Sequence, residues 1–236
     1  MHVLRRLSCV APEVHSRTVK IALLAAVLLV TATLAHAGGQ QIIPDYATAH
    51  RQFFWTKLYV DGGESLYCGV RFKQGQRLTI EHVYSADWIA TKFGCQNRDT
   101  CPNPSYLFAE ADLHNLWPEL GAINSSRGDK LFGEIPGRRR TLPRSVADLN
   151  CDYERTNGRN AIVEPRDSVK GEIARTLFYM HTEYELPLNG MLPMLKRWNA
   201  ADPPNRRERW RNKAIELLQG VRNRFIDDPT LVAALR

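Results

Sequence analysis

The chain has 236 residues, a net charge of +7 at pH 7 and 44% hydrophobic residues. It contains no internal repeat and no low-complexity tract, which excludes repeat architectures and compositionally biased classes. The positive charge favours an anionic partner but identifies none, because many basic proteins bind nothing through their charge.

The first 37 residues have the features of an export leader. Basic residues come first, an uncharged apolar run over 21–35 follows, and Ala35-His36-Ala37 matches a signal-peptidase site. The alternative is an uncleaved anchor, but the run is shorter than the roughly 20 residues that a membrane span needs. We therefore expect a signal peptide over 1–37, one mature domain over 38–236 without a membrane segment, and a periplasmic or secreted location.

Four cysteines remain once the leader is removed, and the net charge falls to +4 because Lys+Arg drops from 32 to 28 and Asp+Glu from 25 to 24. An even number of cysteines in an exported chain is typical of two disulfides. Of the three connectivities that four cysteines allow, we favour Cys95–Cys101, a small loop around Arg98, and Cys68–Cys151, a long-range link. A zinc site is the alternative, although the chain has no close C-x-x-C pair.

Hydrophobic spacing and turn residues predict helices and short strands in the first half of the mature chain. In order, the expected elements are a helix over 48–59, strands over 66–70 and 79–83, a helix over 86–93, a loop over 95–105 and a partly helical segment over 106–116.

The second half is expected to be mostly helical. Pro118 suits the first turn of a helix over 118–124. The clearest amphipathic pattern covers 169–184, where apolar residues recur every three or four positions. The other expected elements are a turn over 125–129, a basic loop over 137–144, a helix that begins near Pro193 and ends near Asn199, a break at Asp202-Pro203-Pro204, and a basic helix over 206–222.

Residues suited to phosphodiester hydrolysis occur in order along the chain. Glu81-His82 comes first, Asp112-Leu113-His114-Asn115-Leu116 follows, and Asn124 comes last. Carboxylate and amide oxygens are the ligands that a magnesium-like ion prefers, and an imidazole can take a proton from water near neutral pH. Adjacent residues of a regular strand point to opposite faces, so Glu81 and His82 can share one site only where the chain bends. A β-hairpin that runs into a helix provides such a bend.

Each of these residues also has an ordinary structural interpretation. An arbitrary Glu-His pair is most often a surface dipeptide, and His114 could be a hydrogen-bonded core imidazole. Asn115 and Asn124 could be caps or turn residues, and Arg98 could be a solvated loop charge. Single residues therefore do not establish a metal site, and only the pattern as a whole can.

The pattern as a whole resembles the bacterial endonuclease I family of exported, non-specific nucleases with a ββα-metal site. The resemblance covers most of the chain from Cys68 to Pro229, and it departs from the family where Ser85 replaces a proline. The matching residues are Glu81-His82-Val83, Cys95, Arg98, Cys101, Glu110-Ala111-Asp112-Leu113-His114-Asn115-Leu116, Pro118, Gly121, Asn124, Arg127, Gly128, Gly171-Glu172-Ile173-Ala174-Arg175, Phe178-Tyr179-Met180, Trp198, Asp202-Pro203, Arg211-Asn212, Ile215, Gln219-Gly220, Asn223, Phe225-Ile226-Asp227 and Pro229.

The resemblance implies an α+β single domain in which helices surround a disulfide-bonded ββα-metal core of the His-Asn type. It implies His82 as the general base, Glu81 and Asn124 as the ligands of one Mg²⁺, for which Ca²⁺ or Mn²⁺ could substitute, and Arg98 as a cation at the scissile phosphate. Glu110, His114 and Asn115 would orient these groups from behind.

The implied function is metal-dependent endonuclease activity on DNA, with RNA left open as a substrate, by a monomer. The residues expected to bind the phosphate backbone are Arg127, Arg138, Arg139 and Arg140, and the basic helix over 206–222 is a further candidate with solvation as its alternative. No base-reading motif is present, which favours cleavage without sequence preference. The competing hypothesis is an exported, non-catalytic nucleic-acid-binding or uptake protein on the same fold. A binding module has no need of a general base, so His82 together with Asn124 favours the enzyme.

Overall fold

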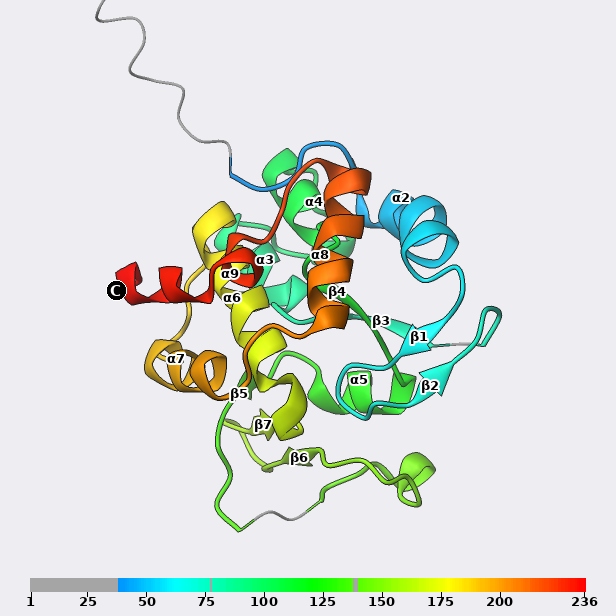
Figure 1. Cartoon of the computed structure of the whole chain (residues 1–236), viewed down its shortest axis with the longest axis vertical. Helices are drawn as coiled ribbons and strands as arrows, with labels where there is room; N and C mark the ends of the chain where they lie inside the picture. The colour runs from blue at the N-terminus through cyan, green and yellow to red at the C-terminus, as the bar shows by residue number, and fades with distance from the viewer. Residues whose placement is uncertain (1–37, 77, 138–139) are drawn as a thin grey trace, which may run out of the picture. The chain divides into compact units, whose positions relative to one another are not determined.

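The computed structural model describes residues 38–76, 78–137 and 140–236, and the expected signal peptide lies outside this part of the chain. Helices surround three small sheets (Figure 1), which confirms the α+β class. The described residues include no helix long and apolar enough to cross a membrane.

The three sheets are short and do not join one another. Strands β1 (Gly63–Glu64) and β2 (Arg71–Phe72) form an antiparallel pair, as do β3 (Thr79–His82) and β4 (Leu116–Glu119). In the third sheet, β7 (Ile162–Glu164) lies between β5 (Leu131–Phe132), to which it is parallel, and β6 (Glu154–Arg155), to which it is antiparallel.

The helices supply most of the regular structure of the described residues. Their bounds in chain order are α2 Tyr46–Thr48, η1 Ala49–Leu58, α3 Ala86–Lys92, η2 Arg98–Thr100, α4 Pro104–Glu110, α5 Gly121–Arg127, η3 Arg144–Val146, η4 Asp167–Val169, α6 Lys170–Tyr184, α7 Leu192–Ala201, α8 Arg206–Gln219, α9 Arg224–Asp227 and η5 Pro229–Ala234.

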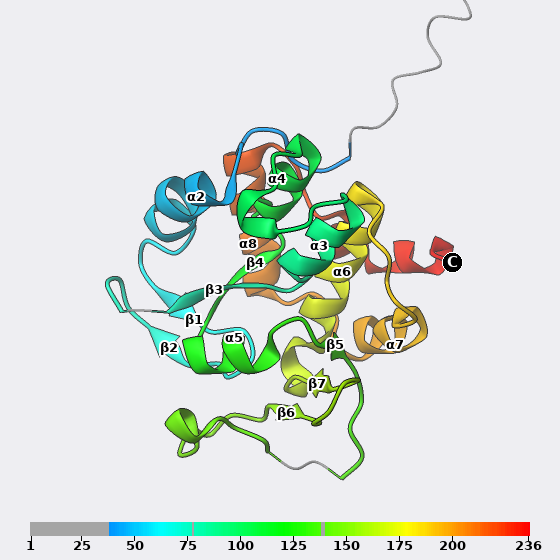
Figure 2. The same cartoon turned by 180° about the vertical axis from the view of Figure 1, so that it is seen from behind.

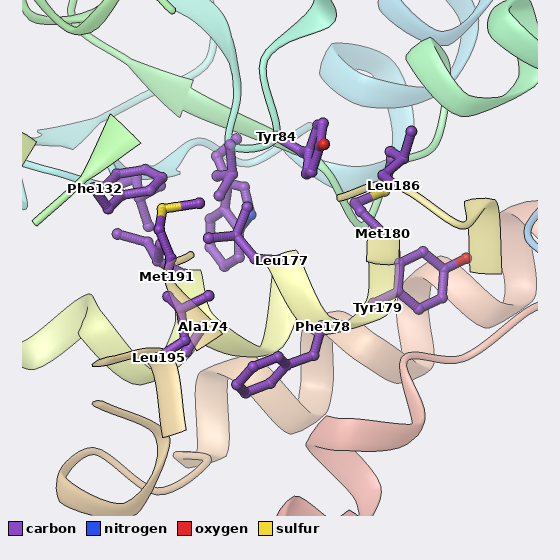
Figure 3. Close-up of a cluster of buried hydrophobic side chains, with 14 of the residues drawn as sticks. Tyr84, Phe132, Ala174, Leu177, Phe178, Tyr179, Met180, Leu186, Met191 and Leu195 are labelled. Carbon is purple, nitrogen blue, oxygen red and sulfur yellow. The ribbon is translucent and has the colours of Figure 1, made fainter. Parts of the chain in front are cut away.

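Helix α6 runs through the middle of the main hydrophobic cluster. All of its residues from Gly171 to Met180 are buried, so this helix is covered around its whole circumference. Figure 3 shows Met180 beneath Tyr84 and beside Leu186, Leu177 at the centre of the cluster, and Ala174 next to Leu195 of α7. The 169–184 pattern therefore predicted the helix correctly, with a start at Lys170.

A buried carboxylate, Asp112, ties the segment before β4 to the helices behind it. Its two oxygens accept hydrogen bonds from the hydroxyls of Tyr179 and Tyr184 in α6, at 2.8 and 2.6 Å, and from the Gln219 amide at the end of α8, at 2.7 Å. The backbone N–H of His114 donates a fourth bond at 2.9 Å. With four donors this carboxylate is well satisfied, although it is fully buried.

The strand expected over 66–70 is wrong, because this segment is a turn. The Gly69 N–H donates to the Ser65 carbonyl at 3.0 Å, and the Val70 N–H donates to the Ser65 hydroxyl at 3.1 Å. Gly69 has φ +65°, which only glycine adopts readily. The apolar residues that suggested a strand are buried in the turn instead: Leu66 is 1% exposed and Tyr67 is fully buried.

The helix expected over 118–124 is wrong in its start and its end. Pro118 lies in β4, opposite Ile80, and its carbonyl accepts a bond from the Leu66 N–H at 3.0 Å. A proline is tolerated there because the short strand has only one ladder partner. The helix is α5 instead, which extends into the turn expected over 125–129 and ends at Arg127, before Gly128, where φ is +54°.

Two further boundaries differ from expectation for local reasons. The loop expected over 95–105 contains η2, and α4 begins within it at Pro104, a residue suited to a first helical turn. The basic helix expected over 206–222 ends at Gln219, because Gly220 adopts a left-handed φ of +81° and closes it.

Ser85 replaces the proline of the family pattern without loss of the bend. Its φ of −53° lies in the range that a proline ring would enforce. Its hydroxyl accepts a hydrogen bond from the Asp87 N–H at 3.2 Å and so caps α3. The chain therefore turns directly from β3 into a helix.

Both expected disulfides are present, Cys68–Cys151 and Cys95–Cys101. The first joins residues 83 positions apart and the second joins residues 6 positions apart. The long link connects the 65–70 turn to the chain before β6, and the short link brackets η2.

The two disulfides should differ in their effect on stability. Cross-links that close longer loops remove more entropy from the unfolded chain, so the Cys68→Ser/Cys151→Ser variant should lose about 2 kcal/mol more than the Cys95→Ser/Cys101→Ser variant. Urea unfolding of both pairs measures the difference. Equal losses would contradict the argument from loop length.

His114 should make stability depend on pH. Burial lowers its pKa to about 4, and its Nδ1 is buried without a partner among the described residues. The unfolded chain takes up the proton near pH 6.5, so this contribution is complete above that pH and is lost as the pH falls toward 4.

Wild-type protein should therefore lose about 2 kcal/mol more than the His114→Gln variant between about pH 7 and about pH 5. Glutamine keeps a donor for the Val221 carbonyl, which His114 Nε2 meets at 3.1 Å. Urea titrations at the two pH values give the comparison, and parallel losses in both proteins would refute it.

Candidate active site

A cavity of about 380 Å³ lies between β3, α3, α4, α5 and η2. In Figure 2, α5 lies below β3, α4 lies above it and α3 lies to its right. Six of the candidate site residues from the sequence line this cavity, namely Glu81, His82, Arg98, Glu110, Asn124 and Arg127.

The end of β3 explains how adjacent residues reach one cavity. Glu81 and His82 pair with Trp117 and Leu116 of β4, and the strand stops at His82. Beyond it, the side-chain amide of Asn115 accepts from the Tyr84 N–H at 2.6 Å and donates to the Tyr84 carbonyl at 2.9 Å. The Val83 N–H donates to the Asn115 carbonyl at 3.0 Å, so the chain leaves the ladder one residue beyond the Glu-His pair, and both residues of the pair border the cavity near this end.

His82 is held in one tautomer. Its Nε2 lies 3.1 Å from the backbone carbonyl of Glu110, and because a carbonyl only accepts, Nε2 carries the proton. Nδ1 is therefore the nitrogen with a free lone pair. The ring of Tyr46 lies 5.0 Å from the imidazole, and burial lowers the pKa of His82 to about 4, so the ring is neutral near pH 7.

Glu81 is a buried carboxylate with one engaged oxygen. Its Oε1 accepts from the Tyr67 hydroxyl at 2.7 Å and lies 3.3 Å from Nη1 of Arg127. Burial raises the pKa of Glu81 to about 7, while Arg127 and the Tyr67 hydrogen bond act in the opposite direction. These two contacts both involve Oε1, and Glu81 lines the cavity. A cation at the cavity would favour the ionised form of this carboxyl.

Asn124 has a fixed orientation as well. Its Nδ2 donates to the Thr79 hydroxyl and to the Ile80 carbonyl, both at 3.0 Å. Since the Ile80 carbonyl can only accept, the amide nitrogen must face β3 and the amide oxygen must face away from it. An oxygen from α5 and a carboxylate from β3 therefore border the same cavity.

Arg127 does not occupy the surface position expected for a phosphate-backbone contact. It is 1% exposed, and its guanidinium donates to the carbonyls of His82 and Val83 at 2.9 and 2.6 Å. These bonds fasten the end of α5 to the end of β3. Burial on this scale does not fit a contact with a duplex, so its effect on the site is to position β3.

Arg98 lies at the rim of the cavity, in the loop that the Cys95–Cys101 disulfide closes. Its side chain is 45% exposed, and its Nε lies 3.7 Å from Asp87 and 3.6 Å from Asp99. Long, solvated ion pairs of this kind are weak. A cation in this position can therefore turn to an anion in the cavity at little cost.

Glu110, His114 and Asn115, which were expected to orient the groups at the site, have different surroundings. Glu110 contributes its backbone carbonyl to His82, and Asn115 fixes the chain beyond β3. His114 does not line the cavity. It packs on Tyr179 at 4.6 Å between ring centres, so its part is in the core.

Two residues of the site environment were missed from the sequence. Tyr67 supports Glu81, and Glu119 accepts hydrogen bonds from the backbone N–H groups of Tyr67 and Leu120 at 2.6 and 2.7 Å. Burial raises the pKa of Glu119 to about 7. Neither residue has a local sequence signal, because both act through contacts with residues distant in the chain.

The expected basic loop is described only in part. Arg138 and Arg139 lie outside the described residues. Arg140 is exposed, and its Nη2 donates to the Asn150 amide oxygen at 2.9 Å.

Comparison with known proteins agrees with this geometry. Residues 29–230 match the family profile described as Endonuclease I. An Endonuclease-1 of Buchnera aphidicola is 29% identical over 72% of this chain and 76% of its own length, and a periplasmic deoxyribonuclease of Aeromonas hydrophila is 26% identical over 72% and 81%. An extracellular ribonuclease of Bacillus subtilis is 34% identical over 50% of this chain, which spans 44% of that protein.

The profile match covers most of the chain, and it includes every residue that borders the cavity. The chain therefore belongs to the endonuclease I family of nucleases.

Proposed function

We propose that this protein is a metal-dependent endonuclease that hydrolyses phosphodiester bonds of DNA without sequence preference, with His82 as general base and one Mg²⁺ bound by Glu81 and Asn124. The observation that carries the proposal is the orientation of His82. Its Nε2–H is held by the Glu110 carbonyl, and its Nδ1 lone pair is left for a water in a cavity that a carboxylate and an amide also border.

The residues at the cavity fit a hard divalent ion. Among the described residues, no group of three or more His, Cys, Asp or Glu side chains is arranged to hold a metal ion. An ion held by the oxygens of Glu81 and Asn124 alone would keep several waters, as Mg²⁺ does in protein sites. When bound, it would neutralise charge on the phosphate and stabilise the leaving oxygen.

The protein's own groups supply the remaining steps. Nδ1 of His82 takes a proton from the attacking water, and the Glu110 carbonyl keeps the ring in place as it becomes charged. The Arg98 guanidinium at the rim stabilises the added charge on the phosphate. The Arg127 contacts with the His82 and Val83 carbonyls hold the end of β3, and with it His82 and Glu81, in a fixed position.

The relatives guide the choice of substrate and location. Two of them are named as a periplasmic deoxyribonuclease and an extracellular ribonuclease. We take DNA as the main substrate and RNA as a second one, acted on in the periplasm or outside the cell, and the two disulfides agree with export. Cleavage of both would follow from recognition through phosphates rather than bases.

Replacement of His82 by Ala should lower the rate of plasmid nicking by about 10²–10⁴-fold, the usual effect of losing a general base. Binding of DNA in the presence of chelator should change little, because the imidazole makes no charged contact. The His50→Ala variant is the control, since His50 is exposed and does not line the cavity. Wild-type nicking by His82→Ala would refute the assignment of the base and favour a binding protein on this fold.

Replacement of Glu81 by Gln should lower the activity, and added Mg²⁺ should partly restore it, because the ion loses one anionic ligand. The glutamine amide oxygen can still accept the hydrogen bond from the Tyr67 hydroxyl. The activity of Asn124→Ala should likewise be partly restored by added Mg²⁺, whereas the activity of His82→Ala should not rise with Mg²⁺. Nicking measured across a magnesium titration separates these cases. Full wild-type activity in EDTA would rule out the mechanism.

A further inference from the structure

A second hollow lies on the other side of α5 from β3. Its volume is about 400 Å³, and it is bordered by α5, by the chain over 141–143 and by the β6 region. Figure 2 shows α5 between β3 above and the β6 segment below. Ser125 borders this hollow and the catalytic cavity alike, so the two adjoin one residue beyond Asn124.

The lining of the second hollow has the chemistry of an anion site. Its lining residues include Arg155, Asn157, Ser125 and Ser126, which carry a guanidinium, an amide and two hydroxyls, and none of its lining residues is acidic. The catalytic cavity differs, because four acidic residues border it: Glu81, Asp87, Asp99 and Glu110. A phosphate therefore meets donors and one positive charge in the second hollow, with no carboxylate to repel it.

Arg155 is held firmly by its backbone, while its guanidinium has no hydrogen-bond or ion-pair partner among residues 38–76, 78–137 and 140–236. The Thr141 hydroxyl donates to the Arg155 carbonyl at 3.1 Å and accepts from its N–H, and Arg155 pairs with Val163 of β7. The side chain is half-buried, yet it forms no ion pair with any carboxylate in the described part of the chain. By contrast, Arg166 and Arg175 are each paired with a glutamate, at 2.9 and 2.6 Å.

We propose that this hollow binds a phosphate that flanks the scissile phosphodiester on the same strand, and that Arg155 is its positioning residue. The inference rests on the proposed function, and it adds a substrate requirement. Consecutive phosphates of one strand lie a few ångströms apart along the helix axis, so a strand that crosses α5 reaches both hollows. Contact with a phosphate carries no base information, so the subsite accepts any sequence.

The test removes one charge from the protein and one from the substrate. Short DNA duplexes are prepared with a neutral methylphosphonate at each position near a single cleavage site. They are cut by wild-type protein, by Arg155→Gln and by Arg159→Gln. Arg159 is an exposed arginine four residues further along that borders neither hollow, so it is the matched control.

Wild-type protein and Arg159→Gln should lose about tenfold in kcat/KM when one flanking phosphate is made neutral, the size of one charge-assisted hydrogen bond. Arg155→Gln should start about tenfold lower on unmodified DNA and lose nothing further at that position. Cleavage by Arg155→Gln that remains as sensitive to the neutral phosphate as wild type would overturn the subsite.

A binding measurement separates this proposal from the catalytic one. The same duplexes are titrated by fluorescence anisotropy in EDTA with the His82→Ala protein, with and without Arg155→Gln. If binding by the double variant no longer depends on the flanking phosphate, the subsite is supported. This holds even if wild-type protein cuts no DNA, because absence of cleavage refutes only the proposed function. Equal dependence in the two proteins overturns the subsite, whatever the enzyme cleaves.

Discussion

The buried carboxylate of Asp112 is the constraint on which the site depends. It fixes the segment before β4 against α6 and α8 through four hydrogen bonds. Glu110 lies just before it and supplies the carbonyl that orients His82, while Asn115 lies just after it and holds Tyr84. His82 is thus oriented through a segment that Asp112 fixes, although Asp112 itself does not line the cavity. The cost of burying the Asp112 charge is offset by hydrogen bonds that also hold this segment in place.

A ββα unit this small cannot hold its own geometry. Its two strands are four residues each, and a two-stranded sheet of that length is marginal in water without further packing. Arg127 compensates by joining α5 to the end of β3, and Tyr67 reaches Glu81 from a turn that a disulfide secures. Burial favours the neutral form of Glu81, and the Arg127 guanidinium opposes this effect. Arg127 therefore both holds the end of β3 in place and favours the ionised form of Glu81.

The sequence located residues that border the cavity better than it located the residues that support them. Glu81, His82 and Asn124 carry chemical identity that a pattern can reveal, and cysteine number and spacing favoured both disulfides. The 66–70 strand failed because a buried apolar run is equally compatible with a turn, and Ser65 and Gly69 decide between them through local hydrogen bonds.

The burial of Arg127 could not be predicted for a different reason. Its partners are carbonyls 44 and 45 residues away, and nothing periodic in the sequence marks such a contact.

The two hollows differ in the charge of their lining residues. The catalytic cavity is bordered by four acidic residues against Arg98 and Arg127, and Arg127 is committed to the backbone. Without a divalent ion, such a cavity repels a phosphate, so the chemistry that cleaves the strand cannot also be what attracts it. Attraction must come from cations outside it that carboxylates do not neutralise. Arg155, across α5, forms no ion pair with an acidic residue in the described part of the chain and meets that requirement. Under the proposed function, a strand long enough to cross the helix would be the favoured substrate.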